Sequence, residues 1–201
     1  GLIVPIGEWV LREACKAAAT WPGNVRVAVN LSAIQFKNRD LVAMVESALT
    51  DAGLVPTRLE LEITESLLLA ENEQIVKTLH ALRKLGVRIS MDDFGTGYSS
   101  LSYLRSFPFD KIKIDRSFMR DLAKRSDSLA IIKAIIGLGQ SLGMSTTAEG
   151  IETQEQLELM RAHGCDEVQG FLFSPPLVPA ALEKLLGSEG AKKLTVIKRA
   201  S

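Results

Sequence analysis

The stretch ISMDDFGTGYSS, residues 89–100, ends a β-rich run in two adjacent carboxylates and then turns at glycine. Asp92 and Asp93 carry like charges and repel each other, so their adjacency at a turn calls for a compensating cation. Gly95 and Gly97 allow the backbone to turn tightly and to approach a ligand closely. The stretch therefore predicts a strand with functional residues at its C-terminal end.

The same alternation of a β-rich run with a longer amphipathic run recurs along the chain. The strand candidates are residues 25–31, 58–64, 88–92, 111–115, 145–149 and 167–173. The helix candidates are residues 6–19, 38–52, 71–85, 127–142, 153–163 and 178–186. Repeated strand and helix units predict a parallel sheet covered by helices, either a closed barrel or a doubly wound sheet. We favour the α/β class and a TIM-like (β/α) barrel.

Length, charge and cysteine content narrow the class of protein. A chain of 201 residues that is 46% hydrophobic can bury the core of one domain. Lys plus Arg equals Asp plus Glu at 24 each, which gives no reason to expect a nucleic-acid polymer or an anionic membrane as partner. Cys15 and Cys165 stand in no metal or redox spacing, so we expect two reduced thiols rather than a disulfide.

The first residues, GLIVPIGEWVLREACKAAA, lack a basic leader, and Pro5, Gly7 and charged residues interrupt their apolar run. This pattern predicts neither a signal peptide nor a membrane-spanning helix. We therefore expect a cytoplasmic chain.

Polar residues fall at or near the C-terminal ends of five predicted strands. They are Asn30, Glu62, Asp92, Lys113 with Asp115, and Glu149. One such carboxylate by itself is most often a helix cap or a solvated loop residue. Polar residues at five strand ends are instead typical of a functional site. Active sites of α/β folds lie at that end of the strands.

Four residues at these strand ends, together with Asp93 beside Asp92, offer a set of hard oxygen ligands: Asn30, Glu62, Asp92, Asp93 and Glu149. Such sets select Mg²⁺, Mn²⁺ or Ca²⁺ over zinc or copper. At a strand end entering a turn, Asp92 and Asp93 can both approach a pair of ions, one as a bridge and one as a terminal ligand. Lys113 is either in a structural ion pair with Asp115 or Glu62, or a charge beside a phosphoryl group or metal-bound hydroxide. Together these residues predict metal-assisted phosphodiester hydrolysis.

Six motifs in order along the chain resemble those of EAL domains, bacterial phosphodiesterases that open cyclic di-GMP to linear pGpG. They are NLSAIQF (30–36), LELEITES (59–66), DDFGTGYSSL (92–101), IKIDRSF (112–118), TAEGIET (147–153) and QGFLFSPPL (169–177). The resemblance covers residues 1–186 as one domain and leaves residues 187–201 as a tail, in which LTVIK is a possible extra strand. It implies dependence on Mg²⁺ or Mn²⁺, inhibition by Ca²⁺, and cyclic di-GMP as the ligand.

The resemblance also assigns roles to individual residues. It implies that Asn30, Glu62 and Asp92 bind a first metal ion, and that Asp92, Asp93 and Glu149 bind a second. The catalytic residues that it implies are Lys113, which helps to hold the attacking water, with Glu149 and the supporting acid Glu152. The residues implied on the substrate side are Gln169, Asp115 and Pro176.

The sequence also departs from the family pattern. No Glu-Ala-Leu tripeptide occurs in it, although that Glu is a further ligand of the first metal ion in the family, and Pro175 stands where a basic residue is usual. The family carries this tripeptide on an early strand, so we expect residues 1–186 to be an N-terminally truncated EAL domain that lacks it. We expect an incomplete barrel with about six of eight strands, whose open edges favour a homodimer or a domain-swapped oligomer. We also expect weakened metal binding at the first position and weak or absent activity.

Three interpretations stay open at this point. The chain is part of a catalytic phosphodiesterase, or a non-catalytic cyclic di-GMP receptor or dimerisation module, or a purely structural piece of a barrel. In the first two cases the parent protein is expected to carry an upstream sensory or GGDEF domain, and anchoring of that parent in a membrane is compatible with the sequence.

Overall fold

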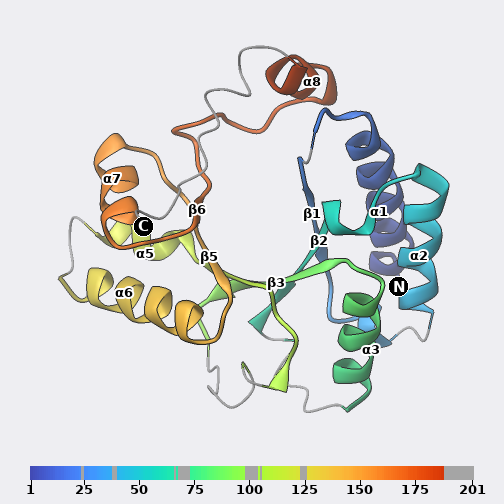
Figure 1. Ribbon diagram of the computed structural model, residues 1–201, viewed down its shortest axis with the longest axis horizontal. Helices are drawn as coiled ribbons and strands as arrows, with labels where there is room; N and C mark the ends of the chain where they lie inside the picture. Colours follow the sequence, from blue (N-terminus) through green and yellow to red (C-terminus); the bar gives the residue numbers. More distant parts are fainter. Residues whose placement is uncertain are drawn as a thin grey trace. The chain divides into compact units, whose positions relative to one another are not determined.

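The computed structural model describes residues 1–23, 25–37, 40–65, 67, 73–97, 104, 106–122 and 126–187. Its six strands form one parallel sheet in chain order, β1-β2-β3-β4-β5-β6 (Figure 1). Among the described strands, β1 and β6 end the sheet. The α/β class with parallel strands is therefore confirmed, and the sheet has the open order of an incomplete barrel.

The chain divides into two compact units, each described here by itself. The first comprises Gly1–Met91 and Gly97–Phe109, and the second comprises Asp92–Thr96 and Asp110–Ser201. No described helix combines the length and the apolar character needed to cross a bilayer.

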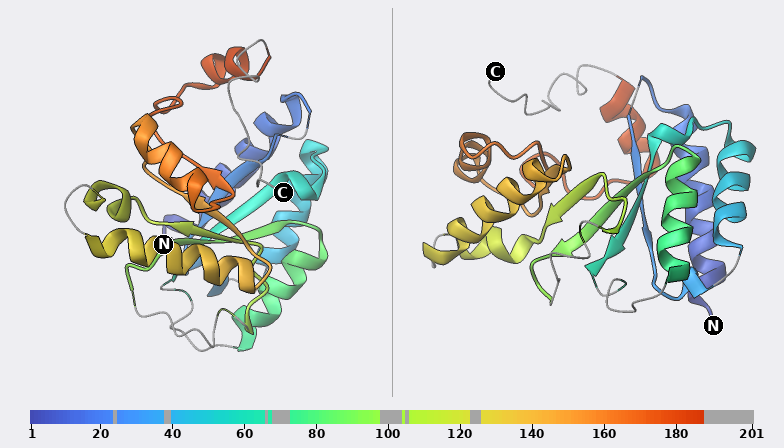
Figure 2. Two further views of the ribbon diagram at one scale, coloured as in Figure 1. Left: turned by 60° about the vertical axis from the view of Figure 1, so that its left-hand side comes forward. Right: turned by 60° about the horizontal axis from the view of Figure 1, so that its bottom comes forward.

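The first unit contains helices α1, α2 and α3 and the first strands of the sheet. Its elements are α1 (Ile3–Thr20), β1 (Val27–Leu31), η1 (Gln35–Lys37), α2 (Leu41–Ala52), η2 (Pro56–Arg58), β2 (Leu59–Thr64), α3 (Glu73–Lys84) and the beginning of β3 (Arg88–Phe94). Helix α1 packs against β1 and α2, and α2 contacts α3 (Figure 1, Figure 2). The buried positions of these helices recur every three or four residues, as in Leu11, Cys15 and Ala18 of α1.

The helix ends of the first unit follow local rules. Helix α2 stops at Gly53, whose φ of 63° is left-handed, and the Leu54 N–H donates to Leu49 O at 3.0 Å. Arg58 donates to Ala18 O at the end of α1 and to Val25 O before β1. The Arg58 guanidinium, in η2, therefore links the C-terminal end of α1 to the segment before β1. It donates a hydrogen bond to a carbonyl group that has no partner within the helix.

The second unit contains the end of β3 and the remaining strands. Its elements are β4 (Lys111–Ile114), α5 (Arg116–Asp121), α6 (Ser126–Ser141), β5 (Ser145–Ala148), α7 (Gln154–Ala162), β6 (Glu167–Val168) and α8 (Pro179–Gly187). Helix α6 packs against β4, β5 and α5. Helix α7 begins with a capping box, in which Thr153 accepts from the Gln156 N–H and Gln156 accepts from the Thr153 N–H.

Two predictions about elements differ from the structure. The strand predicted over residues 167–173 is only Glu167–Val168, because the chain turns over the β5 end, where a Cβ atom at Gly170 would overlap the main chain of Ile151. Helix α5 was not predicted, since it starts directly after β4 without a separate turn and is capped by Asp115. The possible strand LTVIK lies outside the described residues.

Candidate metal and substrate site

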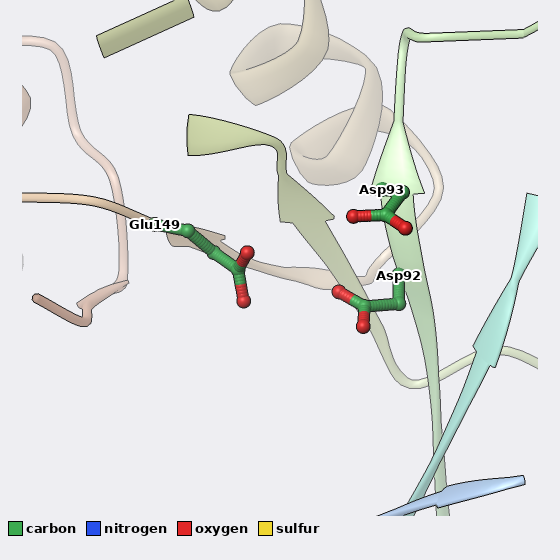
Figure 3. A group of neighbouring side chains, drawn as sticks. All are labelled: Asp92, Asp93 and Glu149. Atoms are coloured by element: carbon green, nitrogen blue, oxygen red, sulfur yellow. The ribbon is translucent and has the colours of Figure 1, made fainter. Parts of the chain in front are cut away.

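The adjacent carboxylates lie at the end of β3, and Asp93 has an unusual backbone. Its φ of 55° makes it the one described non-glycine residue in the left-handed region. Successive side chains of a regular strand point to opposite faces, so this turn of the backbone is what allows both carboxylates to face the same way. Figure 3 shows Asp92 and Asp93 directed toward Glu149, and one carboxylate oxygen of each lies within 4.8 Å of the others.

Main-chain hydrogen bonds hold Glu149 in place just after β5. Its N–H donates to Ile114 O on β4 at 3.1 Å. On the other side, the Gln169 N–H donates to Ala148 O at 2.8 Å, and Gln169 O accepts from the Ile151 N–H at 3.0 Å. The backbone of Gln169 therefore binds on both sides of Glu149 and limits its movement.

Lys113, on β4, places its ammonium between the acids. It is 4% exposed, and its Nζ lies 2.9 Å from Asp92 Oδ1 and 2.6 Å from Glu149 Oε1. These contacts join Lys113 to two of the predicted metal ligands. Lys113 thus supplies positive charge that partly offsets the buried acids.

Burial and mutual repulsion raise the proton affinity of two acids in this group. Burial raises the pKa of Glu149, and the charges of Asp92 and Asp93 raise it further against the lowering effect of Lys113. Burial also raises the pKa of Asp93, followed by the charges of Asp92 and Asp115. A cation bound among these oxygens would favour their ionised forms.

The pKa of Asp115 shifts the other way. Burial raises it, but hydrogen bonds from Ser117 and Arg116 at the start of α5 outweigh burial and leave the pKa below its usual value. The Ser117 N–H donates to Asp115 Oδ1 at 2.9 Å. Asp115 is therefore ionised beside Asp93 and adds to the negative charge there.

The group Asp92, Asp93 and Glu149 fits a divalent cation with oxygen ligands. Asp92 is 9% exposed, and among the described residues its buried Oδ1 accepts no hydrogen bond of favourable geometry, although the Lys113 ammonium is near. A buried carboxylate oxygen in this condition is costly unless a cation binds it. Oxygen donors alone, at this spacing, suit Mg²⁺ or Mn²⁺.

Asn30 and Glu62, the other predicted metal ligands, lie in the first unit as neighbours. They face each other as register partners on β1 and β2, so their side chains leave the same face of the sheet. Glu62 is buried and Asn30 is exposed. The structure brings this pair together, and separately brings together Asp92, Asp93 and Glu149.

The remaining predicted residues lie around the second unit. Gln169 and Pro176 are exposed after β6, which leaves their surfaces open to a ligand. Glu152 is exposed before α7, its N–H donates to Gln156 Oε1 at 2.7 Å, and it is not a member of the acidic group found among the described residues.

Sequence reasoning missed Glu65 in the first unit. Its side chain is 5% exposed, and neither carboxylate oxygen has a hydrogen-bond partner in the described part of the chain. Gly97 lies against it, since a Cβ atom there would be 3.1 Å from Glu65 Oε1. Glu65 follows the end of β2, so the strand-end rule that selected Glu62 was a signal that could have found it.

Comparison with known proteins places this arrangement in a family. A sequence model described as the EAL domain matches residues 1–176. The bifunctional diguanylate cyclase/cyclic di-GMP phosphodiesterase MucR of Pseudomonas aeruginosa is 47% identical over 192 residues, which cover 94% of this chain and 28% of MucR. The chain spans between 22% and 28% of the length of MucR and three other curated relatives.

Solved structures agree with the sequence match. The structure of the MucR phosphodiesterase in complex with c-di-GMP superposes with a TM-score of 0.87 at 46% identity, covering 90% of this chain and 75% of that one. A manganese and c-di-GMP complex of Klebsiella pneumoniae BlrP1 superposes with a TM-score of 0.81 at 34% identity, covering 88% of this chain and 45% of that one. From its sequence, its fold and its strand-end acids, the chain belongs to the EAL domain family.

Proposed function

We propose that this chain carries metal-binding and substrate-binding residues of a phosphodiesterase that opens cyclic di-GMP to linear pGpG. The observation that carries the proposal is the group of Asp92, Asp93 and Glu149 around the buried ammonium of Lys113. The relative MucR is named as a cyclic di-GMP phosphodiesterase, and its solved structure is a c-di-GMP complex, which supports the same ligand here.

The proposed cofactors are two Mg²⁺ or Mn²⁺ ions. The Klebsiella pneumoniae relative BlrP1 was solved as manganese and as calcium complexes with c-di-GMP, which supports a divalent ion as cofactor here. Asn30, Glu62 and Asp92 would hold one ion, and Asp92, Asp93 and Glu149 the other. Ions in such pairs lower the pKa of water and stabilise the attacking and leaving oxygens of a displacement at phosphorus.

The chain's own residues position and charge the site. Lys113 orients the attacking water, and its charge offsets Asp92 and Glu149, which it contacts. Glu152 acts as a supporting acid at the start of α7. Gln169, Asp115 and Pro176 contact the nucleotide, and the exposure of Gln169 and Pro176 is compatible with that role.

The direct test is incubation with cyclic di-GMP and Mn²⁺, followed by chromatographic measurement of pGpG. We expect Asp92→Ala to lower turnover by more than about 100-fold, because it removes the shared ligand of both ions. Glu73→Ala, which removes an exposed acid on α3, is the matched control and should leave turnover unchanged. Turnover that survives Asp92→Ala would refute the assignment.

A receptor that binds cyclic di-GMP without cleaving it is the second candidate. Calorimetry with cyclic di-GMP separates the two, since a receptor binds the nucleotide without releasing pGpG. A chain that neither binds nor cleaves it would contradict both.

We also propose a setting for the site in the cell. MucR combines a diguanylate cyclase with a phosphodiesterase and is several times longer than this chain, which supports further signalling domains, such as a GGDEF or sensory domain, in the parent protein. The proposed location of the site is the cytoplasm, with any membrane anchor supplied by the parent.

A further inference from the structure

A second group of polar side chains joins β4, β5 and β6. It is separate from the group of Asp92, Asp93 and Glu149. Glu167 Oε2 accepts from Lys111 Nζ at 2.6 Å and from Thr147 Oγ1 at 3.2 Å. Lys111 and Thr147 are 6% and 5% exposed, and the Glu167 side chain is 32% exposed. We name Lys111, Thr147 and Glu167 the β4–β6 clamp.

The clamp lies next to the proposed site on the same face of the sheet. Each of its residues stands two positions before a proposed site residue, in the pairs Lys111 and Lys113, Thr147 and Glu149, Glu167 and Gln169. Residues two apart in an extended strand point to the same face. The strand register agrees, because Lys113 is the partner of Thr147 and Thr147 is the partner of Glu167. The three clamp residues therefore share one face of the sheet with Lys113 and lie beside the proposed site.

Strand β6 has little main-chain support of its own. It consists of two residues, and its register with β5 is limited to Thr147 with Glu167 and Ala148 with Val168. The residue that follows, Gln169, makes the main-chain hydrogen bonds on both sides of Glu149. Any movement of β6 would therefore be passed to Glu149 and Gln169.

Burial of the Lys111 ammonium makes its ion pair with Glu167 important for the stability of this part of the sheet. Lys111 is almost fully buried, and a buried ammonium is costly unless an anion and hydrogen-bond acceptors surround it. Glu167 supplies that anion from β6, across β5. The charge on Lys111 thus attracts the short strand into the sheet.

We propose that Lys111, Thr147 and Glu167 are positioning residues, which hold β6 to β4 across β5 and thereby fix Glu149 and Gln169 for reaction. The consequence for catalysis rests on the function proposed above, whereas the positioning itself is a property of the chain alone. It acts through main-chain hydrogen bonds and needs no contact between the clamp and the substrate.

Amide hydrogen exchange in the ligand-free protein tests the positioning. In Glu167→Gln and in Lys111→Met, we expect the Ile151 and Gln169 amides to exchange at least about 10-fold faster, while the Val45 and Ala48 amides in α2 keep their rates. Lys77→Met and Glu73→Gln remove the exposed ion pair of α3 and are the matched controls, with no expected change at Ile151 or Gln169. Unchanged rates at both amides, or the same acceleration at every amide, would overturn the proposal.

Two further variants keep the test decisive if a single charge removal unfolds the protein. Thr147→Val keeps the side-chain volume, removes one hydrogen bond to Glu167, and should accelerate the Gln169 amide about 3-fold. Exchanging the two charges, in Lys111→Glu with Glu167→Lys, should return the rate to within about 3-fold of wild type, whereas Lys111→Glu alone should not. Failure of both expectations would assign Glu167 no positioning role.

Steady-state kinetics then connects the clamp to the proposed reaction. With cyclic di-GMP as substrate, Thr147→Val should lower kcat and raise the Mn²⁺ concentration for half-maximal activity several-fold, with the helical circular dichroism unchanged. Wild-type protein without turnover would refute the enzymatic proposal, and hydrogen exchange would still decide the clamp. If all clamp variants turn over cyclic di-GMP with normal kinetics, the positioning role of the clamp is refuted. The proposed enzymatic function is then unaffected.

Discussion

Asp93 combines two unfavourable features at one residue. Its backbone is left-handed, and its carboxylate lies beside those of Asp92 and Asp115, which raise its pKa together with burial. Asn adopts the left-handed region readily and carries no charge. A residue that lowers stability in this way is expected at a site that binds a cation.

We therefore predict that Asp93→Asn stabilises the metal-free protein and weakens its binding of Mn²⁺. The gain in the free energy of unfolding at neutral pH should be on the order of 0.5–1 kcal/mol, a small value because solvent screens this partly exposed group. Since the folded-state pKa of Asp93 is raised, the penalty of its charge exists above that pKa and disappears below the usual aspartate value of about 3.9. The gain should therefore shrink as pH falls through this window in urea denaturation.

Asp93→Ala is the matched comparison for that prediction. It also removes the charge, but alanine enters the left-handed region at a cost of roughly 1–2 kcal/mol. The alanine variant should thus be less stable than the asparagine variant at every pH. Equal stabilities would show that the backbone of Asp93 is not strained.

At the scale of elements, the crossing of the β6 end over the β5 end depends on Gly170. A Cβ atom there would overlap the main chain of Ile151, which no side-chain movement can relieve. We predict that Gly170→Ala lowers the free energy of unfolding by about 2 kcal/mol or more, measured by chemical denaturation.

The control for this prediction is a glycine at which an added Cβ atom would meet no other atom. Gly137 lies on the exposed side of α6 and has no atom within 4 Å of an added Cβ. Gly137→Ala should raise the free energy of unfolding by about 0.5–1 kcal/mol, because alanine favours the helix. Loss of stability in both variants would contradict the explanation by steric overlap at Gly170.

At the scale of the whole molecule, the prediction of self-association stays open to test. The sheet ends at β1 and β6 among the described strands, and α1 with its N-cap exposes Leu2, Ile6 and Trp9, the last two at 51% and 65%. Exposed apolar side chains on one helix face and open strands favour contact with another copy. We predict a dimer or larger species in light scattering coupled to size-exclusion chromatography.

Substitutions on α1 would locate that contact. Ile6→Glu with Trp9→Glu should shift the protein toward the monomer, whereas Val55→Glu, at a 58% exposed residue before η2, should not. A wild-type protein that is monomeric at high concentration would contradict the prediction.

The sequence by itself determined the parallel α/β sheet, the order of its elements and the acids at its strand ends. These are local properties: a period of two or 3.6 residues, a capping residue or a carboxylate after an apolar run can be recognised without knowledge of distant partners. Asp92, Asp93 and Glu149 were found in this way. Strand 167–173 was predicted too long because its end depends on Ile151, a residue of another segment.

Only the tertiary structure decided how those residues meet. It showed that the left-handed turn at Asp93 directs both acids toward Glu149, that Lys113 pairs with Asp92 and Glu149, and that Lys111 and Thr147 bind Glu167. Each of these contacts depends on the register between strands that are remote in sequence. The pattern within one strand shows which side chains share a face, but which residue of a remote strand lies opposite is decided by the packing of the sheet.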